Sequence, residues 1–539
     1  MDFLRLFADI DKTTSYRMLD TAPPIYEEWK GESFLRVGDR TLSFLAEEAF
    51  HDAAFYLRGA HLEKIAAITE DPQASANDRY VAGSLLRNAA IAAEGFFPIC
   101  QDTGTAGVAA WKGARVLTSG NDEEALGKGI FMAYNKNCLR YSLIFPSSMC
   151  GEANTGSNMP AQTDIYAAAG NEYRFLFVAK GGGSSNKTAF FQESKALLNE
   201  DALEKFIREK TRAIGVAACP PYHLAVVVGG LSPEMNLKIL KLATTGFLDC
   251  LPGYEADGFS AGGGTAFLDR QWSARLLEAA RQTRLGAQFG GKYFALDARV
   301  IRLPRHAASC PVSIGVSCNA DRNILAKITR AGVFLEVLER DPGRFLREGA
   351  QGTAAAEFSR INLDTSMDEI RRQLSRHKTG DMVFLCGPVL VARDMAHARL
   401  FEILQKGGSL PSYFRDHPVY YAGPAKTPEG RAIGSFGPTT AQRMDAYLAD
   451  FMAAGASLVT LAKGNRRPVV TESCKKYGGF YLGTIGGAAA LLASENITAC
   501  ETLDFPEFGM EAVRRIQVRD FPAFILSDDK GNDFYARQG

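Results

Sequence analysis

Short apolar runs alternate along this chain with segments in which apolar residues recur at helical spacing. The runs 174–178, 223–228 and 312–316 predict buried strands, and the segments 46–69 and 202–214 predict helices. Further strands and helices follow each other beyond residue 381. Because strands and helices alternate in both parts of the chain, the predicted fold class is α/β.

Length and a local change in composition predict two domains. The chain has 539 residues, and a prior of about 150 residues per domain allows two to four. Residues 340–380 are charged and polar, contain Asp341-Pro342-Gly343, and hold few large apolar side chains. We therefore predict a larger N-terminal domain over 1–340, a linker over 341–380, and a smaller C-terminal domain over 381–539.

The charge balance argues against several classes of partner. Lys plus Arg and Asp plus Glu both number 61, so the sequence gives no support for nucleic-acid binding or for a membrane surface. No apolar run reaches 18 residues, and the start of the chain does not resemble a signal peptide. We expect a cytoplasmic protein, with a mitochondrial form whose presequence is absent as the alternative.

The turn Cys100-Gln-Asp-Thr-Gly104 places a thiol, an amide and a carboxylate side by side. Ten cysteines are scattered without a CxxC pair, so a disulfide framework is not expected. A metal site would have to collect thiols from distant segments. Cys100, Cys219 and Cys318 lie in turn-rich contexts, and three thiolates leave one position open on a four-iron cluster. Cys310 and Cys150 are rivals.

The loop Lys180-Gly-Gly-Gly-Ser-Ser-Asn-Lys-Thr188 follows a predicted strand, and its glycines allow backbone N–H groups to approach an anion. It differs from a Walker phosphate loop because Asn186 stands where the last glycine is needed. ATP binding and a purely structural turn are therefore alternatives, and a loop for a small dianion is favoured. Further glycine-rich loops lie at 258–264 and 286–291.

The stretch from Gly437 to Arg443 is a candidate carboxylate receptor. Thr439 and Thr440 can cap a following helix, and Arg443 lies one helical turn beyond Thr440. An ordinary capped helix with a solvated arginine is the alternative. A further candidate is His306, which lies near Cys318 in sequence. Three cations are also candidates: Arg140, and Arg393 and Lys463, which both come just after predicted strands.

These motifs, taken in order, resemble the class I fumarate hydratases, the oxygen-sensitive iron–sulfur fumarases. The resemblance spans nearly the whole chain and rests on Cys100-Gln-Asp-Thr-Gly, Lys180-Gly-Gly-Gly-Ser-Ser-Asn-Lys, Cys219-Pro-Pro, Arg305-His306, Val316-Ser-Cys-Asn, Gly437-Pro-Thr-Thr-Ala-Gln-Arg-Met and Leu461-Ala-Lys-Gly. It implies that Cys100, Cys219 and Cys318 hold a [4Fe-4S] cluster. It also implies a homodimer with the active site between an N-terminal cluster domain and a C-terminal domain.

The resemblance further implies reversible hydration of fumarate to malate, a hydro-lyase reaction of the tricarboxylic acid cycle. Proton transfer would fall to Asp102, His306 and Thr439. Substrate contacts would come from Gln101, Arg140, Gly183, Asn186, Lys187, Thr188, Gln192, Arg393, Thr440, Arg443 and Lys463. Three other functions stay open: a sister dehydratase acting on tartrate or mesaconate, a nucleotide-binding enzyme using the loop 180–187, and a cluster-bearing binding protein without turnover.

Overall fold

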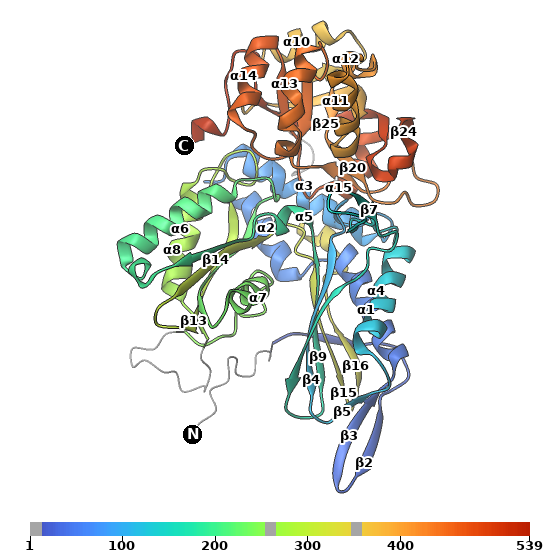
Figure 1. The fold of residues 1–539 in the computed structure, drawn as a ribbon, viewed down its shortest axis with the longest axis vertical. Coiled ribbons are helices and arrows are strands. Elements are labelled where there is room, and N and C mark those ends of the chain that lie inside the picture. Colours follow the sequence, from blue (N-terminus) through green and yellow to red (C-terminus); the bar gives the residue numbers. More distant parts are fainter. Residues whose placement is uncertain (1–12, 254–265, 347–357, 539) are drawn as a thin grey trace.

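The computed structural model describes residues 13–253, 266–346 and 358–538. The predicted glycine-rich loop 258–264 and part of the predicted linker lie outside these ranges. Three large mixed sheets, three small sheets of two or three strands and the helices packed on them form the described part of the molecule, which confirms the α/β class (Figure 1). Among the described helices, none combines the length and the apolar character that crossing a membrane requires.

The first sheet has the strand order β1 (Tyr16–Met18), β16 (Gly332–Glu336), β15 (Asn323–Thr329), β9 (Tyr173–Lys180), β4 (Thr105–Gly113), β8 (Gln162–Ala168). Helices α1 (Asp39–Phe55) and α4 (Asp122–Lys136) cover one face and share a core with it. A Cβ added at Gly129 of α4 would overlap the Ser43 carbonyl of α1. Glycine at that position therefore allows the two helices to pack closely.

The predicted helix over 46–69 is two helices, α1 and α2 (Gly59–Glu70). The chain is extended at Tyr56, and Leu57 forms a bridge with Glu339, whose N–H donates to the Leu57 carbonyl at 2.9 Å. A tertiary contact thus interrupts a helical pattern that sequence spacing alone would continue.

The second sheet has the order β10 (Ala189–Glu193), β14 (Cys310–Ser317), β11 (Tyr222–Gly230), β13 (Ala295–Arg305), β12 (Phe267–Leu268). Every residue of β11 is buried, because both faces of this strand are covered. Leu224 and Val226 share a core with α6 (Glu200–Ile214) and α8 (Arg270–Gln282). Ala225 and Val227 pack with α7 (Pro233–Ala243) and with Leu176 of the first sheet.

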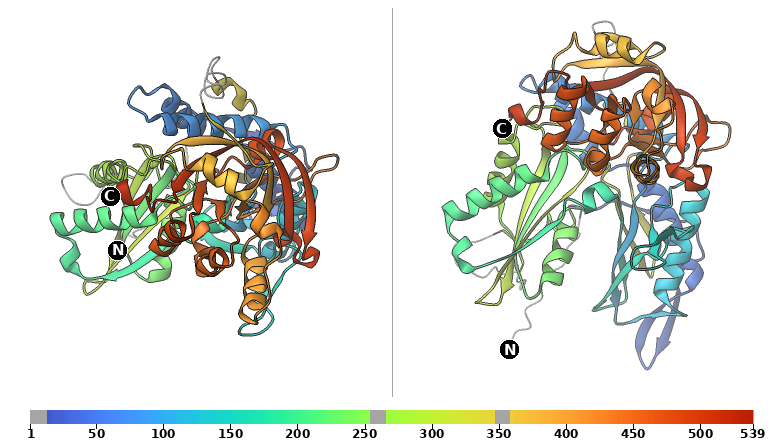
Figure 2. Two further views of the ribbon diagram at one scale, coloured as in Figure 1. Left: turned by 90° about the horizontal axis from the view of Figure 1, so that it is seen from above. Right: turned by 45° about the horizontal axis from the view of Figure 1, so that its top comes forward.

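The third sheet closes on itself. Strands β18 (Met382–Val391), β19 (Val419–Tyr420), β22 (Val459–Ala462) and β23 (Phe480–Gly483) are parallel neighbours. Strand β25 (Val513–Ser527) then pairs antiparallel with both β23 and β18. These five strands form a ring, with β17 (Arg360–Asn362) and β24 (Ile497–Asp504) attached outside it. Figure 2 shows this C-terminal part seated across the ends of the two N-terminal sheets.

The range predicted as linker contains regular structure where it is described. Strand β17 pairs with β18, and α10 (Met367–Leu374) buries Ile370 and Leu374 in the large core cluster. At least these residues pack with the C-terminal sheet. The domain boundaries at 340 and 380 otherwise stay a prediction.

Candidate active site

Strand register brings the N-terminal motifs to one end of the two sheets. Thr105 pairs with Lys180, so the turn 100–104 adjoins the glycine loop. In the second sheet His223 pairs with Ser317, which places Cys219 and Cys318 at the same strand ends. The Lys180 ammonium joins the two sheets by donating to the Val316 carbonyl at 3.1 Å.

Cys100, Cys219 and Cys318 lie within electrostatic reach of one another. Burial is the main cause that raises the pKa of the Cys100 and Cys219 thiols, and the neighbouring cysteines raise both further. Among the residues described, only His61, His223 and Asp321 form a set of three whose ligand atoms all lie within 4.8 Å. At least one pair of the three sulfurs is therefore more than 4.8 Å apart, which is compatible with thiolates that bind different irons of one cluster.

Backbone contacts fix the loop that carries Cys219. The Asn319 N–H donates to the Cys219 carbonyl at 3.2 Å, and the Asn319 amide donates to the carbonyls of Pro220 and Gly486, both at 3.1 Å. A Cβ at Gly486 would overlap the Cys219 sulfur. The segment beside Cys318 and a C-terminal turn thus hold Cys219 from two sides.

The Asp102 carboxylate is held by cations and by the glycine loop. Its Oδ1 lies 3.0 Å from Arg140 Nη2, and its Oδ2 accepts the Gly182 N–H at 2.8 Å. Burial alone would raise the pKa of Asp102, but the charges of Arg140, Arg322 and Lys463 lower it to about 2. The group is therefore ionised at neutral pH and can accept a proton.

The C-terminal candidates lie at the carboxyl ends of the parallel strands, where ligands gather in α/β folds. Arg393 follows β18, Lys463 follows β22, and Thr440 forms a bridge with Lys463. Lys463 Nζ donates to the Cys219 sulfur at 2.9 Å, so this edge faces the thiols. A Cβ at Gly183 would come within 3.6 Å of the same ammonium.

The Arg393 guanidinium is buried and only partly paired. Its Nη2 lies 2.9 Å from Glu511 Oε1, and its Nη1 donates to Thr439 Oγ1 at 3.4 Å, while its Nε has no protein partner within the described chain. A buried donor without a partner is costly, and a bound anion would satisfy it.

Gln101 links the two halves of the chain. Its side-chain amide donates to the Pro438 carbonyl at 3.2 Å, and its buried side chain packs against Gly437 so closely that a Cβ there would overlap it. The Gln101 oxygen lies 3.4 Å from the Cys100 sulfur. This one side chain therefore connects the thiol site with the loop that carries Thr439.

The expected cap at Thr440 is not formed. Thr440 makes no side-chain cap, and a single 3-10 turn, Ala441–Met444, follows it before α13 (Asp445–Ala453). Arg443 is 44% exposed and pairs with Asp394 at 2.9 Å.

The glycine loop leads only into the four-residue helix α5 (Gly182–Ser185) and then into β10. A phosphate loop of the Walker type needs a helix at that point, so the structure counts against ATP binding.

His306 and Gln192 are not brought to the thiols within one chain. His306 lies in the exposed turn between β13 and β14, and all eight residues of β14 separate that turn from Cys318. A strand of this length spans about 26 Å. Gln192 pairs with Pro311 at the same distant end, whereas Asn186, Lys187 and Thr188 lie nearer the thiols. The expected closeness of His306 to Cys318 was wrong because an extended strand carries sequence neighbours apart.

Two charged residues of the site escaped the sequence analysis. Arg322 is buried, and its Nε lacks a partner within the described chain. Burial alone would lower the pKa of Arg322, but the negative charges of Cys100, Cys318 and Asp102 raise it overall. Its position four residues after Cys318 was a signal. Glu511, which holds Arg393 and accepts the Met395 N–H at 2.8 Å, had no local signal.

Comparison with known proteins identifies the family. A protein-family sequence model described as fumarate hydratase (fumerase) matches residues 44–327, and a second family model, described as fumarase C-terminus, matches residues 332–538. The aerobic class I fumarate hydratase of Escherichia coli K12 is 53% identical over 522 residues, covering 97% of this chain and 94% of that protein. Fumarate hydratase 2 of Leishmania major is 52% identical over 507 residues, covering 94% and 88%. The chain belongs to the class I fumarate hydratases.

Proposed function

We propose that this chain is a hydro-lyase that interconverts fumarate and malate between its N-terminal thiol loops and its C-terminal strand ends. The contact between Lys463 and Cys219 carries the proposal, because it places a cation suited to a carboxylate directly beside the thiol site. Arg140 and Arg393 add buried positive charge to the same site. A small dianion is the substrate class that such a site favours.

Cys100, Cys219 and Cys318 would hold a [4Fe-4S] cluster. The donor set fits this group, because three thiols lie within electrostatic reach of one another without all lying within 4.8 Å, and Arg322 and Lys463 can balance their charge. When bound, a cluster with three thiolate ligands supplies an open iron that acts as a Lewis acid on a substrate hydroxyl.

The substrate carboxylates would bind the cations that line the site. Arg140, Arg393 and Lys463 would together form one positively charged region. Arg443 could contribute to it by giving up its exposed ion pair with Asp394. Gln101, Gly183 and Thr440 would orient the substrate between the halves of the chain. The loop residues Asn186, Lys187 and Thr188 would close the N-terminal side, and Gln192 lies too far along β10 to do so in one chain.

Asp102 and Thr439 would handle the protons. The ionised Asp102 carboxylate would accept the proton of the attacking oxygen. Because Thr439 Oγ1 accepts from Arg393, its own O–H can be directed at the substrate carbon. His306 can take part only if a homodimer, which the family resemblance implies, brings this histidine in from a second copy.

Anaerobic purification tests the proposal. Iron, sulfide and fumarate consumption are measured in the same preparation, with tartrate and mesaconate as competing substrates. We expect fumarate hydration with an intact cluster, and we expect Cys318→Ser to lose both. Cys310→Ser, which changes a buried thiol eight residues away, is the matched control and should keep both. Turnover of tartrate or mesaconate without fumarate, or full activity in Cys318→Ser, would overturn the proposal.

A further inference from the structure

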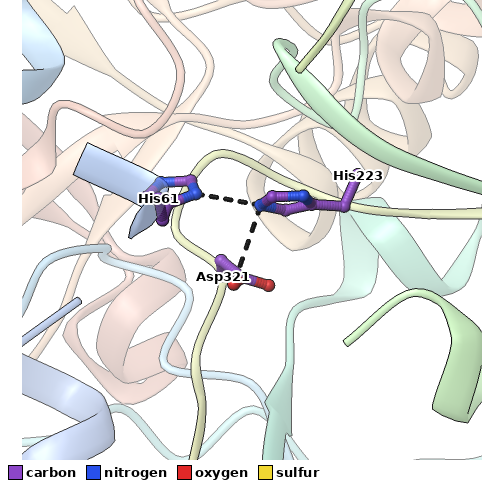
Figure 3. A group of neighbouring side chains, drawn as sticks. All are labelled: His61, His223 and Asp321. Carbon is purple, nitrogen blue, oxygen red and sulfur yellow. Dashed lines mark hydrogen bonds and ion pairs between the residues drawn. The ribbon is translucent and has the colours of Figure 1, made fainter. Parts of the chain in front are cut away.

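The side chains of His61, His223 and Asp321 lie together (Figure 3), and they line a cavity that is distinct from the proposed active site. The cavity has a volume of about 190 Å³, and its lining includes all three residues but none of the three cysteines assigned to the cluster. The three side chains come from α2, from β11 and from the loop after Cys318. They are 3%, 5% and 7% exposed.

Their ligand atoms are spaced as around one ion. His61 Nδ1 lies 2.9 Å from His223 Nε2, and His223 Nε2 lies 3.7 Å from Asp321 Oδ2. A tetrahedral zinc ion with bonds of about 2.0–2.1 Å separates its ligand atoms by about 3.3 Å. The two measured distances lie on either side of that value.

The outer nitrogen of each ring is already engaged by an acceptor. His61 Nε2 lies 2.9 Å from the Asn319 carbonyl, and His223 Nδ1 lies 2.8 Å from the Asp297 carboxylate. Both outer nitrogens must therefore carry the N–H, and both inner nitrogens then present lone pairs to each other. Carbonyl and carboxylate acceptors of this kind orient histidines that bind metals.

Two lone pairs that face each other at 2.9 Å repel, so a positive charge must lie between them. That charge is either an additional proton, which makes one ring cationic, or a metal ion. Asp321 supplies the third ligand atom that a metal ion needs: its Oδ1 accepts from Ser317 Oγ and from Asn323 Nδ2, both at 3.0 Å, while its Oδ2 lies 3.7 Å from His223 Nε2. The neighbouring Arg58 pairs with Glu336 at 2.6 Å and lies 3.9 Å from Asp321.

We propose that His61 Nδ1, His223 Nε2 and Asp321 Oδ2 bind a divalent transition-metal ion of the zinc type, separate from the cluster. Two imidazoles and one carboxylate suit such an ion and leave a fourth position on the side of the cavity. The ion would replace the additional proton between the rings. It would join α2 and β11 to the loop 318–321, and so stabilise the segment that carries Cys318.

The test uses cluster-loaded protein, so that the cysteines assigned to the cluster are occupied. After equilibration with zinc and removal of unbound metal, we expect one zinc per chain in the wild type. We expect near-complete loss in His61→Gln and His223→Gln, and retention in His51→Gln, which changes a histidine bonded to Asn137 elsewhere in the fold. Equal zinc in the wild type and in His61→Gln would overturn the proposal.

Cobalt substitution separates the possible ligands without any variant. Co²⁺ bound by two imidazoles and a carboxylate gives visible d–d bands but no thiolate-to-metal charge transfer. We expect that spectrum in wild-type protein, and zinc should displace it. The spectrum is taken as the difference from cobalt-free, cluster-loaded protein. A difference that is blank, or that shows only thiolate-to-cobalt bands, would overturn the proposal.

Discussion

Lys463 Nζ donates a hydrogen bond to the Cys219 sulfur at 2.9 Å, across 244 residues of sequence. The contact joins a C-terminal strand end to an N-terminal thiol loop, so neither half of the chain holds the site alone. Although burial lowers the pKa of Lys463, the cysteines Cys219 and Cys100 raise it overall, and the ammonium stays charged at neutral pH. One cation can thus serve both the thiol site and a substrate carboxylate.

Replacement of Thr439 by valine should remove proton transfer and leave the cluster in place. Valine keeps the shape of threonine but lacks the hydroxyl that lies 3.4 Å from Arg393. General acid–base groups contribute about 10²–10⁴-fold, and we expect kcat to fall within that range while iron and sulfide stay at wild-type levels. Thr439→Ser keeps the hydroxyl and should retain most of the activity. Unchanged kcat in Thr439→Val would remove this residue from the mechanism.

Removal of the Glu511 side chain should weaken substrate binding by releasing Arg393. Charge-assisted hydrogen bonds contribute about 1.5–3 kcal/mol, so Glu511→Ala should raise KM by about tenfold or more, with a smaller effect on kcat. Glu511→Gln, whose oxygen can still accept from Arg393 or from the Met395 N–H, should recover part of the loss. Exposed Glu507→Ala is the control. A fall in kcat with unchanged KM would argue against a positioning role.

A methyl group at Gly486 should disturb the cluster site from the C-terminal side. The added Cβ would overlap the Cys219 sulfur, and overpacking of this kind costs about 1–3 kcal/mol. We expect Gly486→Ala to fold with reduced iron and sulfide per chain. Gly83→Ala adds a methyl where no atom lies within 4 Å and should keep the full content. A full cluster in Gly486→Ala would show that Cys219 can shift without loss of iron.

His397 should make the protein less stable in mild acid. Burial lowers its pKa from 6.5 to about 4, so the unfolded chain binds a proton between these values that the folded chain does not. Stability is therefore lost as pH falls through this window. From pH 7 to pH 5 the contribution is about 2 kcal/mol.

The variant His397→Phe isolates this contribution. The ring is buried among Phe414, Tyr421 and Phe451, and its Nε2 has no partner within the described chain. Phenylalanine removes the hydrogen bond from His397 Nδ1 to the Arg393 carbonyl, but that carbonyl still accepts the backbone N–H of residue 397. The variant should therefore fit and reduce the acid sensitivity of the urea midpoint. His377→Phe, at a partly exposed site, is the matched control. An identical loss of stability in acid for wild type and His397→Phe would contradict the assignment.

Much of the fold and site followed from local patterns. Continuous apolar runs such as 223–228 predicted strands correctly because a strand covered on both faces needs apolar residues at every position. The family resemblance, rather than spacing, selected Cys100, Cys219 and Cys318 from ten cysteines, and their role as cluster ligands stays a prediction. Strand ends predicted the positions of Arg393 and Lys463. These features depend on residues close in sequence, where periodicity and turn chemistry operate.

The sequence by itself determined the α/β class, most strands and helices, and the motifs that relate this chain to the fumarate hydratases. Only the tertiary structure decided that β25 closes the C-terminal ring, that Arg322 lies near Cys100 and Asp102, that Glu511 pairs with Arg393, and that β14 holds His306 away from Cys318 in one chain. The physical reason is that these relationships depend on strand register and on packing between distant segments. Local spacing encodes which face of an element is buried, but it does not encode which element will cover that face.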